Sequence, residues 1–209
     1  MLFDHDGVLV DTEPWYFRAG ERALADIGVA LDRDRYLQEM NQGLGTWAQA
    51  RAAGIDEETI SRQRAVRDDY YQHYLRTEDI EIEGVVDTLA ELSRCVRMAI
   101  VTTARRADFQ LIHEQRHLRQ FMEFVLVRED YSLAKPHPEP YLTGLRRLGV
   151  TRQETLVVED SARGLSSAVA AGIDCAVVHH EFTKASDFSQ ATYRINSLSE
   201  VKDIVLEGA

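Results

Sequence analysis

Phe3-Asp4-His5-Asp6-Gly7-Val8-Leu9-Val10-Asp11-Thr12 is the stretch of sequence that decides the fold. A short apolar run ends here in two carboxylates two residues apart, and a glycine follows at once. Residues i and i+2 of a strand point to the same side, so we expect Asp4 and Asp6 to project together from a strand end. Gly7 allows the sharp turn that must follow. A simple Asp-x-Asp-Gly turn is the alternative, but such a pair also suits covalent catalysis, with one carboxylate as nucleophile and the other as proton carrier.

The composition is that of an ordinary globular chain. Its 209 residues, 44% hydrophobic and 28% charged, suffice for one large domain or a core with a smaller insert. A net charge of -11 argues against a nucleic-acid partner. No apolar run is long enough to span a bilayer, and the two cysteines suggest no disulfide framework. We therefore expect a cytoplasmic protein without a membrane partner, monomeric by default.

From about residue 97 onward, short apolar runs alternate with longer amphipathic segments. The runs typical of buried parallel strands are Met98 to Val101, Phe124 to Val127, Thr155 to Val158 and Cys175 to Val178. Helices are expected at Ala107 to Phe121, Glu139 to Leu148 and Gly164 to Ala171. Strands that alternate with helices predict an α/β fold, a doubly wound parallel sheet of the Rossmann-like kind.

Residues 13–82 interrupt this alternation, because they offer helical patterns and no convincing strand. The helical patterns are Trp15 to Ile27, Asp34 to Gln42, Trp47 to Ala53 and Glu57 to Thr77. The economical interpretation is an α/β catalytic core formed by residues 1–12 and 83–209, with an inserted all-helical cap at 13–82. We expect this cap over the carboxyl end of the sheet, where ligands bind in open α/β folds, and expect its closure to exclude water.

The loops that follow the later strands also carry residues suited to phosphoryl chemistry. Thr102 and Thr103 can hold a phosphate at a strand-to-helix turn. Lys135 is one of only three lysines, and Glu159 with Asp160 forms a second acidic pair. Each element alone could be a helix cap or a surface charge, but their joint occurrence at strand ends favours one site. Four carboxylates around one lysine require a cation, most simply Mg²⁺.

In this order, Asp-x-Asp-Gly-Val-Leu-Val-Asp-Thr-Glu, then Thr, then Lys-Pro, then Glu-Asp-Ser, the chain resembles the haloacid dehalogenase superfamily. More narrowly, it is similar to the branch with a helical cap between the first two motifs, which includes β-phosphoglucomutase and many sugar-phosphate phosphatases. The likeness covers nearly the whole chain. It implies a Mg²⁺-dependent phosphatase that hydrolyses a small phosphorylated metabolite, such as a sugar phosphate, through an aspartyl-phosphate intermediate.

The same resemblance implies a role for each matching residue. Asp4 would be the nucleophile and Asp6 the general acid and base, while Thr102 and Lys135 would hold the transferring phosphoryl group. The Mg²⁺ ligands implied are the Asp4 carboxylate, the Asp6 backbone carbonyl and Asp160, with Glu159 as an auxiliary acid. Thr103 and Arg105 are further candidates for contact with a substrate anion.

Two alternatives to a phosphatase stay open. The acid at Asp6 disfavours dehalogenation, since dehalogenases of this superfamily lack it. The absence of lysine from residues 13–82 disfavours a Schiff-base phosphonatase and weakens the likeness to β-phosphoglucomutase, although a phosphomutase is still an alternative. A catalytically silent metabolite-binding protein is the alternative from another class.

A second pattern, His113-Glu114-Gln115-Arg116-His117, matches the His-Glu-x-x-His signature of zinc proteases. The residues between the histidines are polar, the expected helix ends soon afterwards, and no third ligand stands out downstream. We therefore interpret it as a chance pattern on a peripheral helix. His179 and His180 are likewise expected to be loop residues and not ligands.

Overall fold

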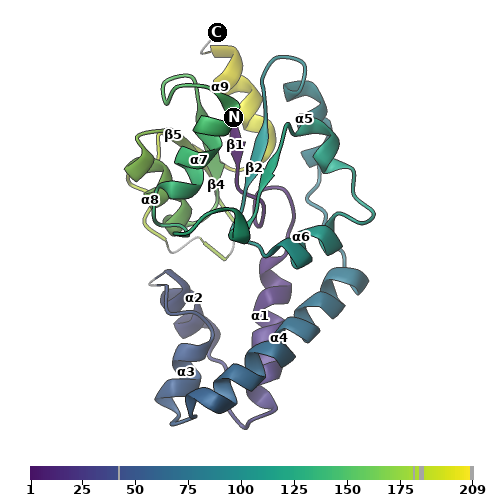
Figure 1. The fold of residues 1–209 in the computed structure, drawn as a ribbon, viewed down its shortest axis with the longest axis vertical. Helices are drawn as coiled ribbons and strands as arrows, with labels where there is room; N and C mark the ends of the chain where they lie inside the picture. Colours follow the sequence, from purple (N-terminus) through teal and green to yellow (C-terminus); the bar gives the residue numbers. More distant parts are fainter. Residues whose placement is uncertain (42, 181, 184–185, 208–209) are drawn as a thin grey trace. The chain divides into compact units, whose positions relative to one another are not determined.

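The computed structural model describes residues 1–209 except 42, 181, 184–185 and 208–209. The chain divides into two compact units, one made of Met1–Asp11 with Glu81–Ala209 and the other of Thr12–Ile80 (Figure 1). These divisions lie one or two residues before the expected boundaries at 12/13 and 82/83. In the described part of the chain, no helix is both long and apolar enough to cross a membrane.

The first unit is built on a six-stranded parallel sheet with the order β3-β2-β1-β4-β5-β6. Its strands are β1 (Leu2–Phe3), β2 (Ala99–Val101), β3 (Val125–Leu126), β4 (Leu156–Glu159), β5 (Asp174–Val178) and β6 (Tyr193–Ile195). The short first strand is central, since Leu2 is level with Ala99 of β2 on one side and with Val157 of β4 on the other. The expected α/β doubly wound fold is confirmed.

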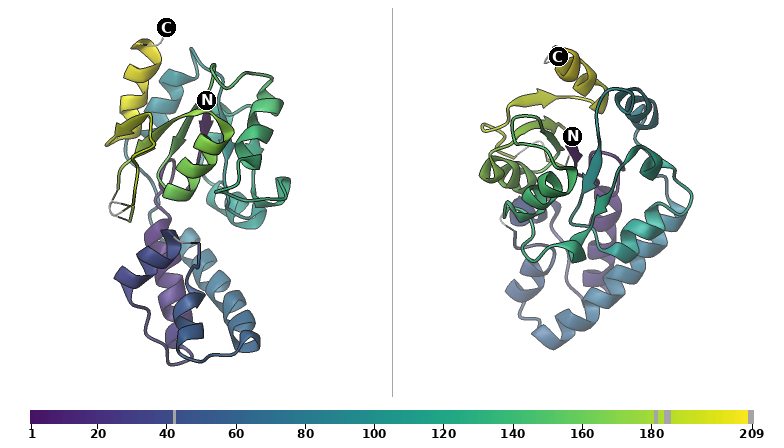
Figure 2. Two further views of the ribbon diagram at one scale, coloured as in Figure 1. Left: turned by 90° about the vertical axis from the view of Figure 1, so that its left-hand side faces the viewer. Right: turned by 45° about the horizontal axis from the view of Figure 1, so that its top comes forward.

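The connections between strands determine which face each helix covers. The helices of this unit are α5 (Val85–Leu92), α6 (Arg106–Ile112), α7 (Glu139–Leu148), α8 (Ala162–Ala171) and α9 (Val201–Glu207). The chain runs outward from β1 through β2 to β3, then returns across the sheet to β4 and β5. Because such crossovers are right-handed, α5 and α6 cover one face and α7 and α8 the other (Figure 2). The reversal falls beside β1, and in open α/β sheets ligands bind at the carboxyl ends of the strands next to such a reversal.

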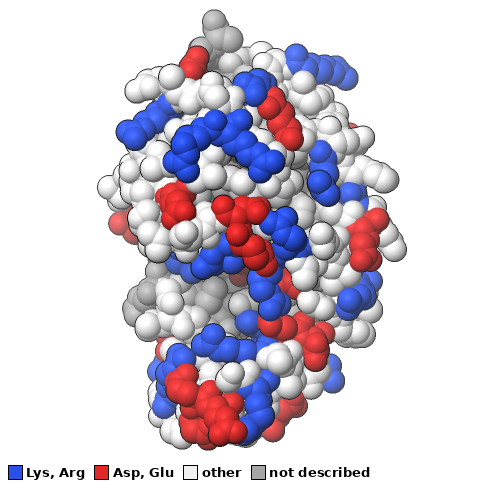
Figure 3. Space-filling view, viewed as in Figure 1, with Lys and Arg blue, Asp and Glu red and all other residues white. Residues whose placement is uncertain are grey.

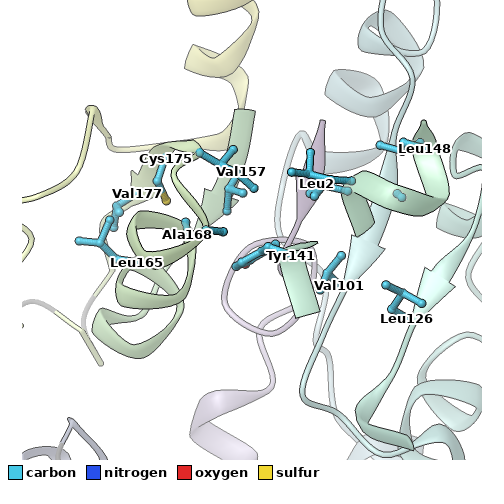
Figure 4. Close-up of a cluster of buried hydrophobic side chains, with 14 of the residues drawn as sticks. Leu2, Val101, Leu126, Tyr141, Leu148, Val157, Leu165, Ala168, Cys175 and Val177 are labelled. Atoms are coloured by element: carbon cyan, nitrogen blue, oxygen red, sulfur yellow. The ribbon is translucent and has the colours of Figure 1, made fainter. Parts of the chain in front are cut away.

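One hydrophobic cluster joins the sheet to α7 and α8. Leu2, Val101 and Val157 present one face of the three central strands, and Tyr141 of α7 and Leu165 of α8 pack against them (Figure 4). All five are at most 3% exposed. Each fully buried side chain of this size contributes about 1.5–3 kcal/mol, so this packing holds the strand ends of the site in place.

Three elements of the first unit were missed from the sequence, and one was too long. The missed elements are α5, β6 and α9. Val85, Leu89 and Leu92 repeat at i, i+4 and i+7, which would have predicted α5. The helix expected at Ala107 to Phe121 is wrong in its second half, because α6 ends at Ile112 and only a 3₁₀ turn follows at Leu118–Phe121.

The second unit contains only helices among its described residues. They are α1 (Glu13–Ala25), α2 (Arg33–Asn41), α3 (Trp47–Ala52) and α4 (Glu57–Thr77). Asp56 caps α4 by accepting a hydrogen bond from the Thr59 backbone N–H at 2.8 Å. The rings of Tyr16 and Tyr71, 5.1 Å apart and edge to face, join α1 to α4. The helix expected at Asp34 to Gln42 matches α2, but Gln42 itself lies outside the described residues.

Charged side chains of both signs lie interspersed on the face of the molecule drawn in Figure 3. On this visible face, acidic and basic side chains lie next to one another in both units. On this face the basic side chains do not gather into the continuous stripe that a nucleic-acid backbone would need.

Candidate active site

The first acidic pair lies directly after β1, at the centre of the sheet. The Asp4 backbone N–H donates to the Val158 carbonyl at 2.8 Å, which continues the parallel register and places Asp4 level with Glu159. Gly7 adopts φ +76°, and a Cβ there would lie 2.2 Å from Asp160 Oδ2. A residue with a side chain cannot make this approach. The glycine therefore lets the turn after β1 press against the loop after β4.

Lys135, from the segment between β3 and α7, reaches into the centre of this cluster. Its Nζ donates to Asp4 Oδ1 at 2.7 Å, to Glu159 Oε1 at 2.7 Å and to the Val101 carbonyl at 2.8 Å. These bonds use all three donors of the ammonium group. Although burial lowers the pKa of Lys135, the Asp4 and Glu159 carboxylates raise it above its ordinary value. Lys135 is therefore a buried and permanently charged cation between two acids.

Glu159 is fully buried and both of its carboxylate oxygens are engaged. Oε1 accepts from Lys135 and, at 2.5 Å, from the Tyr141 hydroxyl, while Oε2 accepts from the Ser161 hydroxyl at 3.1 Å. Burial raises the pKa of Glu159, but the ammonium of Lys135 more than offsets it and holds the pKa below its usual value. The hydrogen bond from Lys135 to Glu159 therefore holds the Lys135 ammonium group in place.

Gly164 of α8 provides the space that the Glu159 carboxylate occupies. A Cβ at this position would lie 1.8 Å from Glu159 Cδ and Oε1. Alanine at a helix position normally stabilises a protein by about 0.5–1 kcal/mol relative to glycine. Here we expect the opposite sign. Gly164→Ala should lower the free energy of unfolding by about 1–3 kcal/mol because the carboxylate must move, as measured by urea denaturation.

Ser166 provides the matched control for this prediction. It lies on the exposed side of the same helix, where its hydroxyl bonds the Ala162 carbonyl at 2.8 Å. Ser166→Ala should change the free energy of unfolding by no more than about 0.5 kcal/mol. Equal stability of the Gly164→Ala and Ser166→Ala proteins would contradict the packing described for Glu159.

Asp160 follows β4 and has a partner that the sequence did not reveal. The imidazole Nε2 of His180 lies 2.6 Å from Asp160 Oδ2. His180 lies in the loop after β5, as expected, but its contact with Asp160 was not foreseen. The signal was available, because His180 comes two residues after β5, at the same edge of the sheet as the other candidates. Its contact orients the carboxylate, as partners of metal ligands commonly do.

The buried acids carry more negative charge than Lys135 can balance. Carboxylate oxygens of Asp4, Glu159 and Asp160 all lie within 4.8 Å of one another. Burial and the Glu159 carboxylate raise the pKa values of both Asp4 and Asp160 well above their ordinary range, against the opposing effect of Lys135. Hard divalent cations prefer such clusters of oxygen ligands. The donor set thus fits Mg²⁺.

Asp6 lies beside this cluster in a more accessible position, next to the fully buried Thr102. The Asp6 side chain is 20% exposed, and its Oδ2 accepts from the Thr102 hydroxyl at 3.3 Å. The Thr102 hydroxyl accepts from the Ala104 backbone N–H at 3.0 Å, and its carbonyl accepts from the Tyr131 hydroxyl at 2.7 Å. Thr102 is therefore held on three sides next to Asp6.

The two further substrate candidates have different environments. Thr103 is half-buried next to Thr102. The guanidinium of Arg105 is exposed and pairs with the Asp108 carboxylate at 3.0 Å, on the helix that Arg105 caps. The structure thus brings together Asp4, Lys135, Glu159 and Asp160, with Asp6 and Thr102 alongside, and gives Arg105 a structural partner.

The His-Glu-x-x-His pattern does not form a zinc site on a helix. α6 ends at Ile112, so its two histidines do not share a helical face. The His113 ring turns inward and its Nε2 lies 2.9 Å from Nε2 of His5, whereas His117 is exposed. The pattern was expected on a peripheral helix, but His113 lies at the end of α6 and contacts His5 of the strand-end loop, which helical periodicity could not show.

The fold and the site together define an α/β enzyme with an acidic cluster at the carboxyl edge of its sheet. The chain belongs to the haloacid dehalogenase-like hydrolase family, which it matches over residues 1–178. This match confirms the predicted superfamily and the class of hydrolases.

Similar proteins cover most of the chain. It is 27% identical to the protein CbbY of Rhodobacter capsulatus, with 95% of this chain and 93% of the relative aligned. It is 28% identical to the fructose-1-phosphate phosphatase YqaB of Escherichia coli, over 83% of this chain and 93% of the relative. The crystal structure of CbbY from Rhodobacter sphaeroides in complex with phosphate has the same fold, with a TM-score of 0.78, 24% identity and coverage of 96% and 94%. The comparisons support the predicted enzyme class, a phosphoric monoester hydrolase.

Proposed function

We propose that this protein hydrolyses a small phosphorylated metabolite, with a sugar phosphate as the favoured class, through a phosphoryl group carried on Asp4. The observation that carries the proposal is the buried contact of Lys135 with both Asp4 and Glu159 inside the acidic cluster. Membership of the hydrolase family and the phosphatase name of the Escherichia coli relative support the same activity. We propose that the helical unit Thr12–Ile80 is the cap domain. The resembling branch of the superfamily has its helical cap at this position, between the first two motifs.

The proposed reaction consists of two in-line transfers. In the first, the Asp4 carboxylate attacks phosphorus, the bond from phosphorus to the alcohol oxygen breaks, and Asp6 gives its proton to that oxygen. In the second, Asp6 takes a proton from the water that attacks the same phosphorus, and Asp4 is released with inorganic phosphate. Thr102 would bind an equatorial oxygen of the phosphoryl group, where negative charge is greatest. Lys135 would do the same by exchanging its hydrogen bond to Asp4 for one to a phosphoryl oxygen.

We further propose that Asp4, the Asp6 backbone carbonyl and Asp160 would hold Mg²⁺. When bound, Mg²⁺ would neutralise the phosphoryl oxygens and the acids that Lys135 leaves unbalanced. Glu159 is assigned to positioning Lys135 and not to direct ligation, because both of its oxygens already accept hydrogen bonds. His180 would hold the Asp160 carboxylate in the orientation that ligation requires.

A panel of phosphorylated compounds tests this function. We would measure phosphate release from sugar phosphates, phosphoglycolate, a nucleoside monophosphate, pyrophosphate and p-nitrophenyl phosphate, with Mg²⁺ and with EDTA. The proposal expects release that requires Mg²⁺ and is fastest for one sugar phosphate. Mg²⁺ binding with no release from any compound would reject the phosphatase and favour a phosphomutase or a silent binding protein.

Binding of Mg²⁺ can be tested without any substrate. Because Mg²⁺ relieves the repulsion among the buried acids, it should raise Tm in differential scanning calorimetry, by about 5–10 °C at 100 times the Kd. Asp160→Asn removes one of these charges and one ligand. We expect this variant to have a higher Tm than the native chain in EDTA, by at least about 2 °C, and to gain nothing from Mg²⁺.

Asp203→Asn is the control for that measurement, since Asp203 lies in α9, away from the acidic cluster. Its response to Mg²⁺ should equal that of the native chain. An Asp160→Asn protein that keeps the full Mg²⁺ shift would contradict the proposed ligand set.

A further inference from the structure

We propose that His113 is a positioning residue that acts through His5 on Asp6, by a chain of two imidazole rings with one defined direction of hydrogen bonding. The inference rests on the proposed role of Asp6 as general acid and base. The two histidines are His5, which lies between Asp4 and Asp6 in the sequence, and His113, which follows α6. The sequence had offered His113 only as half of a zinc signature.

The two rings are packed together below the strand-end loop. His5 is 0% exposed, and its Nε2 lies 2.9 Å from Nε2 of His113. Phe109 of α6 packs on both rings, with centroid distances of 4.9 Å to His5 and 4.3 Å to His113. On the other side of its ring, His5 Nδ1 lies 3.5 Å from Asp6 Oδ2. The pair therefore connects α6 to the proposed proton carrier.

A nitrogen-to-nitrogen distance of 2.9 Å between two imidazole rings requires one proton between them. Burial, followed by the neighbouring His5, lowers the pKa of His113 to about 3, so His113 is neutral at the pH of an enzyme assay. The proton belongs either to His113, which then donates to His5, or to His5, which then donates to His113. Each of these two arrangements also determines which outer nitrogen, His5 Nδ1 or His113 Nδ1, carries the other N–H proton of the two rings.

The surroundings of the two outer nitrogens favour donation by His113. If His113 Nε2 donates, His5 carries its proton on Nδ1 and presents an N–H to the Asp6 carboxylate. In the reverse arrangement a lone pair of His5 faces that carboxylate, and His113 carries a buried N–H on Nδ1. Neither His5 Nδ1 nor His113 Nδ1 makes a hydrogen bond of normal geometry within the described residues. A buried donor without a full hydrogen bond is costly in either arrangement, but only the first places that donor 3.5 Å from a carboxylate oxygen, so the first arrangement is favoured.

One group acts in the opposite sense. The backbone of Arg116 raises the pKa of His113, as a nearby hydrogen-bond acceptor would. Its effect is smaller than that of burial and of the neighbouring His5. The Arg116 backbone lies outside hydrogen-bond geometry with His113 Nδ1. The negative charge of Asp6 at 3.5 Å from His5 therefore decides the direction of the chain.

This direction has a consequence for Asp6. The Oδ2 atom of Asp6 accepts a hydrogen bond from the Thr102 hydroxyl at 3.3 Å. The N–H of His5, the preceding residue in the chain, faces the same oxygen at a nitrogen-to-oxygen distance of 3.5 Å. The hydrogen bond from Thr102 and the electrostatic attraction of the His5 N–H together limit rotation of the carboxylate. His113 thus orients a proton-transfer group without touching the substrate.

The tautomers can be observed directly by two-bond ¹H–¹⁵N NMR of the full chain labelled in histidine. We expect His5 to carry its proton on Nδ1 and His113 on Nε2. Removal of the carboxylate in Asp6→Ala should populate the reverse arrangement. A His5 ring protonated on Nε2 in the native chain, or tautomers unchanged in Asp6→Ala, would overturn the proposal. This measurement needs no turnover, so it is decided even if the proposed phosphatase activity fails.

Kinetics with p-nitrophenyl phosphate test the positioning role. His113→Leu cannot donate, so we expect kcat to fall about 10-fold with KM unchanged, the size typical of outer partners of a site. His113→Gln keeps an N–H donor and should retain kcat within about 3-fold, while both variants lose similar packing. His117→Leu, at an exposed histidine of the same segment, should match the native chain. Equal kcat in the leucine and glutamine variants at 113 would show a structural role only and overturn the proposal.

Discussion

Replacement of Asp4 by asparagine is expected to lower kcat for phosphate release by at least about 10⁴-fold, the scale of losing a covalent nucleophile. Asparagine keeps the shape of the side chain and can still accept a hydrogen bond from Lys135, which lies 2.7 Å from Asp4 Oδ1. It lacks the negative charge that attacks phosphorus. The measurement is steady-state phosphate release from p-nitrophenyl phosphate in the presence of Mg²⁺.

The variant should remain folded, because removal of one of several crowded carboxylates relieves repulsion. Asp11→Asn is the matched control, since Asp11 is an exposed acid of the same segment. It should keep kcat within about 3-fold of the native value, as expected for a surface substitution. An Asp4→Asn protein that retains a tenth or more of native kcat would rule out Asp4 as the nucleophile.

Replacement of Lys135 by methionine should cause the largest loss of stability. Its Nζ is the cation within 2.7 Å of both Asp4 and Glu159, and the side chain is 3% exposed. Without it, buried acids are left unpaired, and breaking a buried ion pair in this way costs about 3–5 kcal/mol. Urea denaturation in EDTA should show this loss. Glu159→Gln in the same chain should recover part of it, since one of the unpaired charges is then removed.

Lys202 provides the control for this prediction. It forms an ion pair of 2.8 Å with Glu91, but the two side chains are 32% and 53% exposed. Water screens such a pair, so Lys202→Met should lower the free energy of unfolding by less than about 1 kcal/mol. If Lys135→Met and Lys202→Met lost equal amounts, the buried ion pairs of Lys135 would not contribute as described.

The α/β core could be predicted because buried parallel strands leave a simple signature. The apolar runs around Ile100, Leu126, Val157 and Ala176 became β2, β3, β4 and β5 within one or two residues of their expected ends. Once these strands are parallel, their carboxyl ends share one edge of the sheet. The rule predicts that the segment after β3 begins at the same edge as the acids, but Lys135 lies nine residues beyond β3, and its contacts depend on how that segment folds.

The partners within the site could not be predicted in the same way. Whether Glu159 faces a metal or Lys135 depends on Tyr141 and Gly164, which belong to the packing between α7, α8 and the sheet. The His5–His113 contact depends on the end of α6 at Ile112. Tertiary contacts determine where a helix ends and which way a polar side chain turns. The periodicity of apolar residues in the sequence predicts neither of these. His180 was missed for a simpler reason, since the strand-end rule was not extended to β5.

Identification of the residue that carries the phosphoryl group is the most direct test of the account. The native protein would be mixed with p-nitrophenyl phosphate and Mg²⁺, quenched in acid within the first turnover, reduced with borohydride and mapped by peptide mass spectrometry. We expect a reduced aspartyl side chain at Asp4, and none at Asp6, Asp11 or Asp160. A protein that turns over normally with the modification at another residue, or with none at any residue, would contradict it.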